Sequence, residues 1–198
     1  MQAPMNTGSP ESSPGGSLPQ APCAGVYPSA WIRDASTLDN VPYRIRPIRP
    51  DDAARELAFI QALSPDALYN RMLCGFKLPS AEQLEHWVCV DYRLQMAFVA
   101  VVGEGSDEQI IGIARYSTDG DRSCEYAITI ADAWQDHGVG TTLSHFLIEY
   151  ARMCGITEMH AVMLATNHRM LDLARSLGMR VTLDRREPRL MCASLPLA

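Results

Sequence analysis

The apolar residues of this chain follow two periodicities, which divide it into segments of different character. Apolar residues alternate with polar ones, or apolar and β-branched residues run together, over 43–49, 96–104, 109–118, 124–130, 158–164 and 189–195. These patterns predict β-strands that are buried on one or both faces of a sheet. Residues 134–150 instead place Leu143, Phe146, Leu147 and Tyr150 at helical spacing, which predicts an amphipathic helix.

Capping residues mark the starts of three further helices in the first half of the chain. Asp51-Asp52, which follows Pro50, is a good cap for a helix that runs to about Leu63. A second helix is expected after Ser64-Pro65, because proline is tolerated at the first helical position. Residues 80–83, Ser-Ala-Glu-Gln, form a capping-box signature for a third, short helix. A meander of strands followed by alternating strands and helices predicts a mixed, three-layer α/β/α fold.

Residues 1–40 differ in composition from the rest. Up to Ile32 the only charged residue is Glu11, and six of the chain's 13 prolines precede residue 31. Segments rich in glycine, serine and proline bury too little apolar surface to offset the entropy that ordering costs. We therefore predict a flexible tail over 1–40 and one folded domain over 41–198. Tyr27 and Trp31 are apolar exceptions, and both docking on the domain and exposure fit their pattern.

The segment 135–141, Gln-Asp-His-Gly-Val-Gly-Thr, connects a predicted strand to the predicted helix. Glycines let a backbone approach a phosphate, and the free N–H groups that open a helix attract anions. A P-loop needs Lys and then Ser or Thr after its second glycine, where this chain has Thr141-Thr142, and a dinucleotide fingerprint needs glycine at Leu143. The remaining pattern, Gln-x-x-Gly-x-Gly-Thr, favours another phosphate-bearing cofactor, although an ordinary strand-to-helix turn has similar glycines.

This pattern resembles the acyl-CoA pyrophosphate loop of the GNAT superfamily of N-acetyltransferases. The resemblance includes residues 167–171 (Asn-His-Arg-Met-Leu) and 177–179 (Leu-Gly-Met) downstream, and 43–52 upstream. The segments 64–69, 90–92 and 96–101 are similar to the acetyltransferase domains of bacterial protein-lysine acetyltransferases, including those fused to domains like ADP-forming acyl-CoA synthetases. The resemblance covers about Val41 to Leu197 and implies the GNAT fold, with a mixed, mostly antiparallel central sheet.

The resemblance also implies acetyl-CoA as cosubstrate and suggests which residues bind it. Three strand residues that end five positions before Gln135 are expected to line the pantetheine through backbone hydrogen bonds, with one amide near the thioester oxygen. The implied cofactor-binding set is Ile128, Thr129, Ile130, Gln135, Asp136, His137, Gly138, Val139, Gly140, Thr141 and Asn167. For Asn167 a helix N-cap is the alternative role. His137 contributes either its protonated ring or its backbone alone.

Glu125 is the candidate general base. It stands three residues before the implied pantetheine triplet, where the similar lysine acetyltransferases carry a glutamate, and alternation places it on one face with Ala127 and Thr129. A partly buried carboxylate there is expected to take a proton from the acceptor ammonium, directly or through water, which contributes about 10²–10⁴-fold. The alternative is a strand glutamate paired with Arg115 or Arg122. The tyrosine that many family members use as general acid is replaced by Ala174, so the general acid is unassigned.

Composition narrows the possible partners and compartment. The net charge of -6 provides no basic field for nucleic acid. The six cysteines include no Cys-x-x-Cys pair and no histidine at ligand spacing, which indicates buried thiols and no metal site. Neither a membrane span nor a signal peptide is evident, so we expect a cytoplasmic monomer or homodimer.

The predicted function is transfer of an acetyl group from acetyl-CoA to a primary amine, with a protein lysine as the leading acceptor and Glu125 as general base. Two alternatives stay open. One is an acetyltransferase for a small amine, such as a polyamine, an amino acid or a drug. The other is a regulatory module that binds acyl-CoA without turnover.

Overall fold

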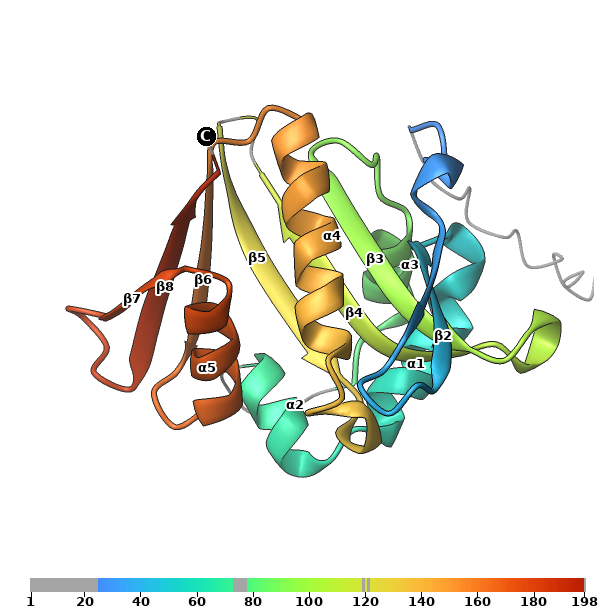
Figure 1. The fold of residues 1–198 in the computed structure, drawn as a ribbon, viewed down its shortest axis with the longest axis horizontal. Helices are drawn as coiled ribbons and strands as arrows, with labels where there is room; N and C mark the ends of the chain where they lie inside the picture. Colours follow the sequence, from blue (N-terminus) through green and yellow to red (C-terminus); the bar gives the residue numbers. More distant parts are fainter. Residues whose placement is uncertain (1–24, 73–77, 119, 121, 198) are drawn as a thin grey trace, which may run out of the picture.

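The computed structural model describes residues 25–72, 78–118, 120 and 122–197, and its centre is an eight-stranded sheet with the order β1-β2-β3-β4-β5-β6-β8-β7 (Figure 1). All neighbouring strands are antiparallel except β5 and β6. The sheet is therefore mixed and mostly antiparallel, as predicted. The strands are β1 (Arg33–Ser36), β2 (Pro42–Pro47), β3 (Gln95–Val102), β4 (Gln109–Ser117), β5 (Ser123–Ile130), β6 (Glu158–Leu164), β7 (Arg180–Leu183) and β8 (Leu190–Pro196).

Helices cover both faces of the sheet and give the predicted three layers. In Figure 1, α4 crosses the near face of the sheet in front of β3, β4 and β5, and α1 and α3 lie behind it. The helices are α1 (Ala53–Ala62), α2 (Pro65–Met72), α3 (Ala81–Val88), α4 (Val139–Met153) and α5 (His168–Ser176). Among the described residues, no helix is both long and apolar enough to cross a membrane.

Of the predicted caps, the capping box of α3 is present, whereas the Asp52 side chain forms no capping hydrogen bond with α1. The Ser80 hydroxyl accepts a hydrogen bond from the Gln83 N–H at 3.2 Å, and the Gln83 side chain accepts one from the Ser80 N–H at 2.9 Å. Asp52 accepts a hydrogen bond from the Arg49 N–H at 2.8 Å. Asp52 is also fully buried, where it forms two 2.7 Å hydrogen bonds with the guanidinium of Arg46. Glu108 contacts the same guanidinium at 2.5 Å, so Arg46 is held between two carboxylates.

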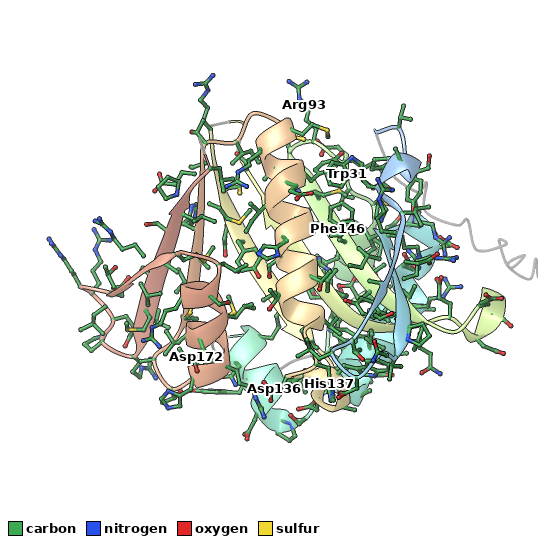
Figure 2. The ribbon with its side chains drawn as sticks, in the orientation of Figure 1. Trp31, Arg93, Asp136, His137, Phe146 and Asp172 are labelled. Carbon is green, nitrogen blue, oxygen red and sulfur yellow. The ribbon has the colours of Figure 1, made fainter. Side chains whose placement is uncertain are left out.

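The N-terminal segment belongs to the fold from residue 25 onward, so the predicted flexible tail is wrong for residues 25–40. Residues 33–36 form β1, which pairs with β2 at the edge of the sheet. The Trp31 ring packs against Tyr150, Phe98 and Phe146 at centroid distances of 5.1, 5.9 and 6.3 Å. Figure 2 shows Trp31 next to Phe146, on the side of α4 that faces the N-terminal segment. The rest of the predicted tail, 1–24, lies outside the described residues.

The alternation of side chains along β5 assigns its residues to the two faces of the sheet. Tyr126 faces α4, where its hydroxyl lies 2.7 Å from the hydroxyl of Ser144. Ile128 and Ile130 lie on the same face, close to the start of α4. Ala127 and Thr129 instead line a small cavity together with residues of α1, α2 and α3. The same alternation assigns Glu125 to this second face.

Candidate active site

The strands β5 and β6 separate after a short parallel segment. Their pairing comprises Ser123 with Glu158, Cys124 with Met159 and Glu125 with His160. Within the described residues, the rest of β5 has no strand partner on this side. Backbone N–H and C=O groups on an open strand edge are available to a ligand that lies alongside it.

Two hydrogen bonds identify which residues of β5 direct their backbone groups to this open edge. The Ala131 N–H donates to the Ile111 carbonyl at 2.9 Å, toward β4. The Gln135 side chain donates to the Ile130 carbonyl at 3.1 Å, on the other side. Because backbone groups alternate along an antiparallel strand, those of Ile128 and Ile130 face the opening and those of Thr129 face β4. The backbone contact expected from Thr129 is therefore wrong, because its groups are directed to β4. Among the described residues, Ile128 keeps both backbone groups free at the opening, and Ile130 keeps its N–H.

The loop 135–138 and the start of α4 concentrate backbone donors at one end of this opening. Gly138 has φ +85°, a conformation that side chains disfavour, and α4 begins at the next residue. The first backbone hydrogen bond of the helix runs from Thr142 to the Gly138 carbonyl. Over the described part of the chain, the N–H groups of residues 137–141 have no acceptor. Together with the positive end of the helix dipole, they form a site suited to phosphate.

The N-terminal segment contacts this loop, and the sequence did not predict these contacts. The Leu38 N–H donates to the His137 carbonyl at 3.0 Å. The His137 Nδ1 lies 2.6 Å from an oxygen of Asp39. Asp136 forms an exposed ion pair with Arg169 at 3.1 Å. Figure 2 shows Asp136 and His137 where α4 begins, with Asp172 on the neighbouring helix α5. The histidine and aspartate are thus placed at the phosphate-binding end, each with a partner on another segment.

A large open groove connects the phosphate-binding loop to the free edge of β5. Its volume is about 820 Å³, and its walls come from α2, β5, β6, the loop before α4, and α5. Among the described charged residues of its lining, acids outnumber arginines: Asp66, Glu125, Asp132, Asp136 and Asp172 against Arg71 and Arg169. The lining therefore carries an excess of negative charge, which favours a cationic ligand beside the donor-rich loop. Hydrogen bonds from Ser64 lower the pKa of the Asp132 carboxyl, which keeps this rim charged.

Glu125 lines the groove, but its side chain is exposed rather than partly buried as expected. Of the two arginines named as alternative partners, Arg115 binds Glu56 at 2.5 Å. Within the described residues Glu125 forms no ion pair. Its carboxylate is therefore free to meet a cation that enters from solvent.

Asn167 and Ala174 lie on the α5 side. The Asn167 side-chain oxygen accepts a hydrogen bond from the Met170 N–H at 3.1 Å, which is the N-cap role. Asn167 also lines the groove, so its amide nitrogen remains available to a ligand. Ala174 is fully buried and holds no proton-donating group near the opening.

The fold and this site define a class of protein that places an acyl thioester beside an amine. Residues 43–180 match the family described as Acetyltransferase (GNAT) domain, and the chain belongs to this family. It is an acetyl-CoA-dependent N-acetyltransferase.

Two relatives and one solved structure illustrate its similarity. The chain is 39% identical over 156 residues to Acetyltransferase PA5475 from Pseudomonas aeruginosa, covering 78% of this chain and 83% of that protein. It is 31% identical over 138 residues to Acetyltransferase Pat from Mycolicibacterium smegmatis, covering 69% of this chain but only 40% of Pat. The GNAT domain of S. lividans PAT superposes with a TM-score of 0.79 at 24% identity, over 86% of this chain and 99% of that domain.

Proposed function

We propose that this enzyme acetylates the side-chain amine of a protein lysine, and that Glu125 is the general base. The observation that carries the proposal is a free carboxylate on the acceptor side of an open groove whose other end collects unpaired N–H groups. A lysine side chain carries its charge on a long flexible stem, so it can enter such a groove from a bulky partner.

The same residues that open the groove suit acetyl-CoA. The N–H groups of residues 137–141 would hold its pyrophosphate, and the free backbone groups of Ile128 and Ile130 would pair with its pantetheine. Gln135 supports this edge by its hydrogen bond to Ile130, and the Asn167 amide is available nearby. When bound, acetyl-CoA supplies the activated acyl group. No residue of this chain needs to form a covalent bond to it.

Two protein groups would assist the transfer itself. The Ile128 N–H faces the opening, so it would donate to the carbonyl oxygen as negative charge develops there. Glu125 would accept a proton from the acceptor ammonium, since only the neutral amine has the lone pair that attacks. Because Glu125 is exposed, it can return this proton to solvent after each turnover.

A small polyamine is the second candidate acceptor. The excess of acidic over basic residues in the groove lining favours a molecule with several positive charges. The site does not require the acceptor to be attached to a protein, so the two candidates differ in the size of the acceptor rather than in its chemistry.

The test measures thiol release from acetyl-CoA with lysine-bearing proteins and with small amines, including spermidine. Wild type, Glu125→Gln and Glu149→Gln are compared, because Glu149 is an exposed glutamate on α4 outside the groove lining. We expect Glu125→Gln to be slower by about 10²-fold, with acetyl-CoA affinity unchanged by calorimetry, and Glu149→Gln to match wild type.

Release with spermidine and not with proteins would replace the lysine acceptor by a polyamine. Equal rates for wild type and Glu125→Gln would contradict the base assignment. Tight acetyl-CoA binding without release from any amine would favour a binding module instead of the proposed lysine acetyltransferase.

A further inference from the structure

A small cavity lies under the acceptor side of the groove, between β5 and the helices α1 to α3. Its volume is about 20 Å³. A cavity of about 10–15 Å³ or more on this measure holds one water molecule when polar groups line it. Arg71, Ala127 and Thr129 line both this cavity and the groove, so the two spaces adjoin at these residues.

Two oxygen atoms in the wall of this cavity lack hydrogen-bond partners. They are Oε2 of Glu56 and Oγ1 of Thr129, both buried and both without a partner among the described residues. An unpaired buried polar atom is destabilising, so native structures rarely leave one without a protein or water contact. One water molecule in the cavity can donate a hydrogen bond to the carboxylate and form a second with the hydroxyl.

The other half of the Glu56 carboxylate is fixed in place. Its Oε1 accepts a hydrogen bond from Arg115 at 2.5 Å, and the Arg115 guanidinium lies 5.7 Å from the centre of the Trp87 ring. Burial raises the pKa of Glu56, and the charge of Arg115 opposes this only in part. Burial and the charge of Arg115 lower the pKa of Arg71, which also feels the charges of Glu56 and Glu125. Glu56 is therefore a rigid carboxylate with an increased tendency to take up a proton.

We propose that Glu56 and Thr129 hold one water molecule beneath the acceptor site, and that this water carries a proton from the acceptor amine to Glu56. The inference rests on the proposed function and adds a second route for the proton beside Glu125. Thr129 is next to Ile128, whose N–H faces the groove, while the Thr129 side chain faces the cavity. Thr129, which would hold the water, is thus the neighbour of the residue proposed to stabilise the oxyanion.

One N–H bond of the acceptor ammonium breaks, and its electron pair stays on nitrogen. The proton passes to the water as a proton of that water passes to Oε2 of Glu56, which becomes a neutral carboxylic acid. After turnover the proton returns by the same water to the groove and its solvent. Glu56 does not touch the substrate in this scheme; it positions the water and accepts the proton that the water passes on.

The water itself is tested by crystal structures of the acetyl-CoA complex at a resolution of about 1.5 Å. Wild type is expected to show one water within hydrogen-bond distance of both Glu56 Oε2 and Thr129 Oγ1. Thr129→Ser keeps the hydroxyl and should keep this water, whereas Thr129→Val, which has nearly the same shape, should lose it or leave it displaced. A wild-type cavity without water would overturn the proposal whatever the acceptor is.

The proton route is tested by pH profiles of kcat/KM with spermidine and with a lysine-containing peptide as probes. Glu56→Gln and Thr129→Val are each expected to lose about tenfold and to shift the acidic limb of the profile, because one of two proton acceptors is disconnected. Thr129→Ser is expected to stay near wild type, and the double variant Glu56→Gln/Thr129→Val to be no slower than either single variant.

Thermal unfolding and acetyl-CoA calorimetry on the same variants separate this role from a structural one. If kcat/KM of Glu56→Gln and Thr129→Val falls by the same factor at every pH, and the acidic limb does not shift, the relay is contradicted. The proposed function would not be affected by that result. Equal losses of kcat/KM in Thr129→Ser and Thr129→Val would also contradict the relay but not the proposed function. No turnover of either probe by wild type would contradict the proposed function, and the relay with it.

Discussion

Replacing Trp31 by alanine tests whether the N-terminal segment is an integral part of the domain. The ring contacts three aromatic rings at 5.1 to 6.3 Å, and each such pair contributes about 0.5–1.5 kcal/mol beyond its buried area. Truncation of a core tryptophan costs about 3–5 kcal/mol, and Trp31 is only partly buried. We therefore expect Trp31→Ala to lower the free energy of unfolding by about 2–4 kcal/mol.

The assay is urea unfolding followed by circular dichroism, because the substitution removes one of the three tryptophan fluorophores of the chain. Val26→Ala is the matched control, since the Val26 side chain is 93% exposed and its truncation should change stability by less than about 0.5 kcal/mol. A protein that begins at residue 41 should lose at least as much stability as Trp31→Ala. Trp31→Ala within about 0.5 kcal/mol of wild type would refute the reasoning and make the segment an appendage.

Two further predictions concern the charged core and the cofactor loop. Burial acts to raise the pKa of Asp52, but the hydrogen bonds and charge of Arg46 outweigh it and hold the pKa below its usual value. Asp52→Asn should therefore cost about 3 kcal/mol at pH 7, and this difference should shrink as pH falls below about 4 through the folded-state pKa; denaturation curves with a constant difference between pH 7 and pH 3 would contradict it. Gly138→Ala should cost about 1–2 kcal/mol and weaken acetyl-CoA binding, because φ is +85° and the new methyl group would lie 3.3 Å from Leu38. Gly155→Ala, at the other end of α4 with φ +82° and open space around it, should cost a similar amount without affecting binding by calorimetry; equal binding losses in both variants would exclude a local role for Gly138.

Local signals in the sequence explain why most of the fold was predictable. Two helix starts are determined by residues that are close together in the sequence: the capping box of Ser80 and Gln83 for α3, and Pro65 for α2. The strands β3 to β5 are long and apolar enough for their hydrophobic pattern to be recognised in the sequence. By contrast, β1 has four residues, three of them exposed, and β7 is equally short. Their stability comes from pairing with β2 and β8, which no local pattern encodes.

The candidate site likewise has a part that local sequence patterns predict and a part that they do not. The phosphate-binding loop is a contiguous pattern, because glycine conformation and helix N–H groups are properties of neighbouring residues. The cluster around Glu56 has no such contiguous pattern. Glu56 binds Arg115, which is 59 positions away in the sequence, and shares only a cavity between layers with Thr129. The sequence pointed to Glu125, which lines the groove, but its exposure depends on how α2 and β6 leave the groove open.

The most direct test of the account is the change in backbone amide chemical shifts of the ¹⁵N-labelled protein when acetyl-CoA is added. New hydrogen bonds to phosphate and pantetheine should move the amide protons of residues 137–141, and those of Ile128 and Ile130, strongly downfield. The Thr129 amide, which already donates toward β4, should move much less and serves as an internal control. Large shifts at Thr129 with small ones at Ile128, Ile130 and the loop would contradict the proposed binding edge.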